Sequence, residues 1–79
     1  MITLKEAFLE LHDRLMSQLA ETIWTINRVK SMTQKEVEKF QGKGVIKGKL
    51  LVDLASEKKE REGNIKVIKE IIEQNEKQN

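Results

Sequence analysis

The first 29 residues carry a row of large apolar side chains that recurs with the period of an α-helix. The steps along the row are three or four residues, through Leu4, Phe8, Leu11, Leu15, Leu19, Ile23 and Ile26. This spacing places the side chains on one helix face. A second row runs beside it, through Leu9, Met16, Ala20 and Trp24. The combined apolar face is too wide for one neighbouring helix to cover, so the helix is expected to pack on more than one side.

Local signals set the expected bounds of this first helix. Thr3 followed by Glu6 matches a capping box, in which a Thr hydroxyl and a Glu carboxylate each accept a hydrogen bond from a free backbone N–H. Because the apolar period continues past residue 30, we expect one helix over about residues 3–41. A second Thr-x-x-Glu sequence at Thr33 and Glu36 leaves open a kink or a new helix start just before it.

Two glycines, Gly42 and Gly44, mark the clearest break in the chain, because glycine adopts the left-handed conformations that end a helix. A second helix is predicted over about residues 45–76, although Gly48 leaves room for a start only near Lys47. This helix crosses a charged stretch without apolar residues, and Gly63-Asn64 within that stretch is a second candidate break. We favour one long helix here, because its length then matches that of the first.

The pattern therefore predicts a single all-α domain over residues 1–79, built as an antiparallel helical hairpin. Two helices leave part of the apolar face uncovered, and we expect the chain to close as a dimeric four-helix bundle. The expected self-association or partner face consists of Phe8, Leu9, Leu15, Met16, Leu19, Ile23 and Trp24. Trp24 is expected to be buried core, covered in part by the aliphatic stems of Lys58 and Arg61. The alternative is a compact three-helix bundle, broken at the glycine turn and at residue 63.

Composition narrows the class of protein. Apolar residues make up 38% and charged residues 35% of the chain, and proline and cysteine are absent. The absence of cysteine excludes disulfides and thiolate metal sites. The net charge of +2 predicts no strong field for nucleic acid or anionic lipid. With no signal-peptide pattern and no apolar stretch of about 18 residues, we expect a soluble, cytoplasmic protein without a membrane partner.

A search for reactive groups predicts no catalytic, cofactor-binding or metal-binding residues. The one histidine, His12, lies at the edge of the apolar face, and a half-covered structural role is favoured over catalysis because no positioned partner is evident. The glycines around Gly48-Lys49 do not match a phosphate-binding loop, because Leu50 stands where that motif has Ser or Thr. An enzyme is therefore not expected.

Basic residues gather around the glycine turn, and Lys43, Lys47 and Lys49 are the candidate nucleic-acid contacts. Lysines of this kind suit phosphate contacts, whereas base stacking would need aromatic residues that are scarce here.

Two functions remain open. The favoured one is a small helical interaction protein, such as an adaptor, inhibitor or assembly factor, with an unidentified protein partner. The alternative is a nucleic-acid-binding module that uses the turn lysines.

Overall fold

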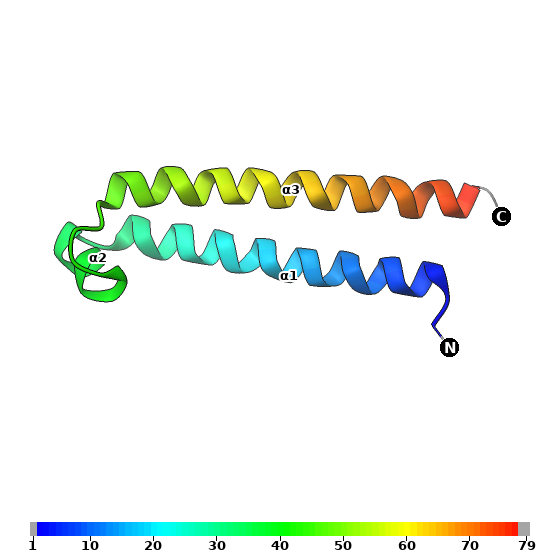
Figure 1. The fold of residues 1–79 in the computed structure, drawn as a ribbon, viewed down its shortest axis with the longest axis horizontal. Coiled ribbons are helices and arrows are strands. Elements are labelled where there is room, and N and C mark those ends of the chain that lie inside the picture. The colour runs from blue at the N-terminus through cyan, green and yellow to red at the C-terminus, as the bar shows by residue number, and fades with distance from the viewer. Residues whose placement is uncertain (1, 78–79) are drawn as a thin grey trace.

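A computed structural model describes residues 2–77 as an all-helical hairpin (Figure 1). It contains α1 (Leu4–Ser31), α2 (Gln34–Gln41) and α3 (Lys47–Lys77). Helices α1 and α3 lie side by side and run antiparallel, while short α2 sits at the end where the chain reverses. The molecule is a rod of 55 × 22 × 17 Å. Its radius of gyration is 17.1 Å, against about 12 Å for a compact domain of this length. The all-α prediction is confirmed, and the chain does not form the compact three-helix alternative.

The prediction of one helix over residues 3–41 is wrong. Helix α1 ends at Ser31, and Met32 has an extended backbone with ψ of 148°. A complete capping box then starts α2: the Glu36 N–H donates to Thr33 Oγ1 over 3.2 Å, and the Thr33 N–H donates to Glu36 Oε1 over 3.1 Å. The second Thr-x-x-Glu sequence therefore begins a new helix.

A small apolar cluster explains why the chain breaks here. Val37 is 0% exposed, and it packs with buried Val29 and Met32. Half-buried residues from the turn and from α3 surround them: Val45, Leu50, Leu51 and Leu54. The break turns α2 back, so that Val37 closes the apolar cluster at this end of the hairpin, and burial of that side chain stabilises the turned-back form.

Helix α3 begins at Lys47 and continues to Lys77 without a break at Gly63. The turn before it uses Gly42 and Gly44, which have φ of +121° and +91°, a region that favours glycine. The predicted turn is thus confirmed, and the candidate break at residues 63–64 is not used. An unbroken helix keeps the isoleucines after Gly63 on the same face as the leucines before it, so both segments pack against α1.

The contact between α1 and α3 is apolar towards the chain termini and polar in its middle. Half-buried side chains toward the termini include Phe8, Leu11, Leu15, Ile65, Ile68 and Ile72. In the middle, Gln18 and buried Thr22 of α1 occupy the inner face, and Lys58 and Arg61 of α3 are half-buried. These two basic side chains therefore lie on the inner side of α3. Their stems do not cover Trp24, however, because Trp24 lies on another face of α1.

Candidate interaction surface

The structure divides the seven residues predicted to form a self-association or partner face into two groups. Phe8, Leu15 and Leu19 are half-buried in the direction of α3. The other four remain exposed, by 43% for Leu9, 45% for Met16, 38% for Ile23 and 61% for Trp24. We call these four residues the outer stripe of α1. Leu9, Met16 and Ile23 are seven residues apart, so they align along the helix and present an apolar strip that no part of residues 2–77 covers.

The prediction that Trp24 is buried core is wrong for the single chain. Its neighbour is Arg28, one turn along α1, whose guanidinium carbon lies 5.2 Å from the centre of the indole ring. The same carbon lies 5.9 Å from the ring centre of Phe40 on α2. Arg28 therefore bridges two exposed aromatic rings by cation–π contacts. This bridge extends the apolar surface of the outer stripe from α1 onto α2.

The turn that joins α2 to α3 is held by Gln34. Its Nε2 donates to the Val45 carbonyl oxygen over 2.7 Å, and its Oε1 accepts from the Lys47 N–H over 2.9 Å. The second bond satisfies one of the free N–H groups at the start of α3. No local pattern in the sequence marks this role of Gln34, because the partners of its amide lie 11 and 13 residues away.

The three candidate nucleic-acid contacts do not form one equivalent set. Lys43 and Lys49 are exposed, whereas Lys47 is half-buried. The Lys47 Nζ donates to the Lys30 carbonyl oxygen over 3.1 Å, so it caps the C-terminal end of α1, where a positive charge is favourable. Lys47 is therefore not free to contact a ligand in the way that Lys43 and Lys49 are, and its replacement is expected to weaken the end of α1.

Charge is unevenly distributed along the rod. We define the closed end as residues 28–53, which include seven basic and three acidic residues, a net charge of +4. We define the open end as residues 2–13 and 68–77, which include three basic and six acidic residues, a net charge of −3. Figure 1 places these two groups at opposite ends of the hairpin. The small total charge of the chain conceals this polarity.

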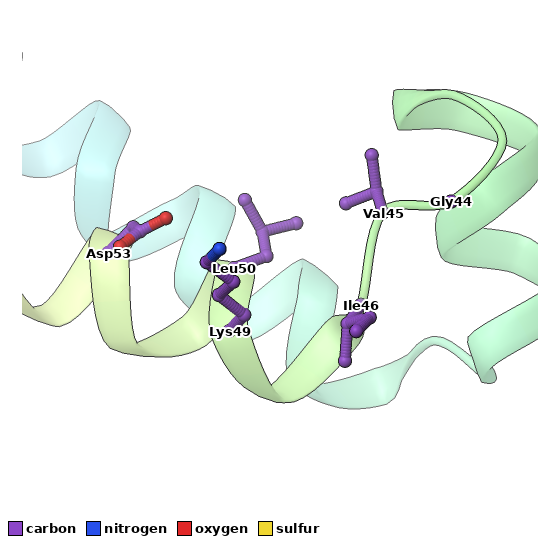
Figure 2. A pocket seen from close by; sticks show the side chains of 6 residues that line it. All are labelled: Gly44, Val45, Ile46, Lys49, Leu50 and Asp53. Atoms are coloured by element: carbon purple, nitrogen blue, oxygen red, sulfur yellow. The ribbon is translucent and has the colours of Figure 1, made fainter.

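A shallow hollow of about 280 Å³ lies beside the turn. Figure 2 shows that its lining comes from the turn and from the first two turns of α3: Gly44, Val45, Ile46, Lys49, Leu50 and Asp53. Three of these side chains are aliphatic, and Lys49 and Asp53 lie one helical turn apart. The lining is therefore mostly apolar, with one lysine and one aspartate.

Other polar side chains form pairs within one helix or between α1 and α3, where Lys5 Nζ lies 3.4 Å from Glu76 Oε1. Arg61 donates to Glu57 Oε1 from Nη2 over 2.6 Å and from Nε over 3.1 Å. The His12 Nδ1 lies 3.9 Å from Asp13 Oδ1, too far for a hydrogen bond. Within residues 2–77, no three His, Cys, Asp or Glu side chains are grouped to hold a metal ion. In the same residues, no helix has both the length and the apolar content needed to cross a bilayer.

Comparison with known proteins finds no family model, no curated protein and no solved structure that matches this chain. The features of the surface are therefore the available guide to function.

Proposed function

We propose that this protein is a small, non-enzymatic helical interaction protein, an adaptor, inhibitor or assembly factor, that acts through a helical surface. We also propose that it self-associates through the outer stripe of α1 and closes as a homodimeric four-helix bundle. The observation that carries this proposal is the outer stripe, an apolar strip from Leu9 to Trp24 that α3 leaves uncovered. Contiguous exposed apolar surface of this kind is typical of protein interfaces.

The thin core of the single chain also supports the proposal. Only Val29, Met32 and Val37 are buried apolar residues among those described, and all three lie at the closed end. Elsewhere α1 and α3 contact each other through half-buried side chains. A two-helix layer cannot enclose side chains on all sides, whereas a second layer would cover the outer stripe.

Sedimentation of the parent and of two matched variants tests the proposal. Met16→Glu places a charge in the outer stripe, and Val52→Glu makes a similar apolar-to-Glu change on α3, where Val52 is 68% exposed. We expect a dimer for the parent and for Val52→Glu, and a monomer for Met16→Glu with its helical circular dichroism retained. A monomeric parent at tens of micromolar protein would overturn the proposal.

The positive closed end supports a second candidate function, nucleic-acid binding through Lys43 and Lys49. Each phosphate contact contributes about 0.9 to the slope of log affinity against log salt concentration for duplex DNA. A Lys43→Gln/Lys49→Gln variant should therefore lower the slope by at most about two units. Exposed Lys59 and Lys66 on α3 provide the matched control pair. Absence of salt-dependent binding of the parent to DNA or RNA would exclude this candidate.

A further inference from the structure

The exposed area of the chain is large for its mass. The hairpin exposes 6310 Å², whereas a compact monomer of 9.2 kDa is expected to expose roughly 4,900 Å². The excess is therefore about 1,400 Å² per chain. A standard protein interface buries about 800 Å² per partner, and obligate homodimers bury about 1,000 Å² or more. A second copy of the chain thus matches the surface that the first leaves exposed.

The charge polarity of the rod distinguishes the two ways in which such copies can pack. A parallel pair would place two closed ends of +4 together and two open ends of −3 together. An antiparallel pair would place each closed end beside the open end of the other copy, so both ends would be attracted. Neighbouring charges are screened over about 8–10 Å at ordinary salt, so this preference acts between ends in contact.

The spacing of the outer stripe is compatible with the antiparallel arrangement. Met16 lies midway between Leu9 and Ile23. A two-fold axis that passes near Met16 therefore brings Leu9 of one copy level with Ile23 of the other. Both copies then use the same residues, as a two-fold interface requires.

We propose that two copies pair antiparallel through the outer stripe of α1, about a two-fold axis near Met16, with each positive closed end beside the negative open end of the other copy. The partner of the outer stripe is thus a second copy in a defined orientation. This inference rests on the proposed self-association and adds its direction and register.

Single cysteines test the orientation directly, because the chain has none of its own. Met16→Cys should form a disulfide-linked dimer, since the two residues meet at the axis. Leu9→Cys alone should not, because its two copies would be separated by 14 residues of helix, about 21 Å, while a disulfide needs Cα atoms within about 7 Å. A mixture of Leu9→Cys and Ile23→Cys chains should cross-link to each other.

Each outcome of the cysteine test has a defined meaning. Self-linking of both Leu9→Cys and Ile23→Cys would show a parallel dimer and overturn the orientation while leaving self-association intact. If sedimentation gives a monomer, the proposed self-association fails, and the orientation fails with it. Cross-linking of the mixed pair, without self-linking of either variant, would establish the antiparallel form.

Charge reversal gives a second test in which the two orientations predict opposite signs. Lys43→Glu/Lys49→Glu changes the closed end from +4 to neutral. At low salt, this variant should dimerise more weakly if the copies are antiparallel, because an attraction is lost. It should dimerise more tightly if they are parallel, because a repulsion is lost. Adding Glu70→Lys and Glu73→Lys to the same chain changes the open end from −3 to +1. A parallel pair should then tighten further, because the repulsion between its two open ends falls. An antiparallel pair should gain no attraction, because its closed ends are neutral.

Discussion

Val37→Ala probes the contact that turns α2 back onto the hairpin. Val37 is the one side chain below 2% exposure among the described residues, and it packs with Val29 and Met32. The change removes two carbon atoms, worth roughly 0.8 kcal/mol each in transfer free energy, and leaves a cavity that adds to the loss. We expect the free energy of unfolding to fall by about 2–3 kcal/mol.

This loss is large for a chain of 79 residues, whose total stability is expected to be roughly 4–12 kcal/mol. It corresponds to a decrease of about 8–24 °C in melting temperature. The matched control is Val52→Ala, the same chemical change at a side chain that is 68% exposed. Because alanine favours helix more than valine does, the control should be neutral or slightly stabilising.

Urea unfolding followed by circular dichroism at 222 nm measures both variants. The protein concentration must be held equal, since dimerisation would make stability depend on it. If the two variants differ by less than about 0.5 kcal/mol, the range of ordinary surface substitutions, the cluster around Val37 does not stabilise the fold and the explanation for the break at Met32 is refuted.

Three further outcomes are expected. The hydrogen bonds from the Thr33 backbone and side chain lower the pKa of the Glu36 carboxyl below its ordinary value. The contribution of this carboxylate to the cap of α2 is therefore complete above the unfolded-state pKa and is lost as the pH falls through the lowered, folded-state pKa. Carboxyl NMR titration should find a raised Glu36 pKa in Thr33→Ala, and an unchanged pKa would contradict the assignment. Gly63→Ala should stabilise α3 by about 0.5–1 kcal/mol, because a Cβ there meets open space. Gly44→Ala, at φ of +91°, should destabilise the turn. Melting temperatures equal to that of the parent in both variants would refute both statements. Trp24→Ala should cost the single hairpin less than the roughly 3–5 kcal/mol of a buried aromatic, because Trp24 is 61% exposed, and it should weaken dimerisation measured by sedimentation.

The sequence by itself determined the features that depend on neighbours a few residues away. The helical period of the first 30 residues, the cap at Thr3 and the glycine turn at Gly42–Gly44 are all local, and each is present in the structure. In each of these cases, a short-range hydrogen-bonding or side-chain pattern has one clear solution.

Tertiary structure decided the features for which local signals allowed two solutions or none. Around Met32 the apolar period favoured a continuous helix and the Thr33 capping box favoured a new one; burial of Val37 in a cluster drawn from three parts of the chain decided between them. Trp24 belongs to a wide apolar face, and its exposure depends on which side of α1 receives α3. Gln34 and Lys47 make their bonds to residues 11 to 17 positions away, because the turn brings together groups that no periodicity along the chain relates.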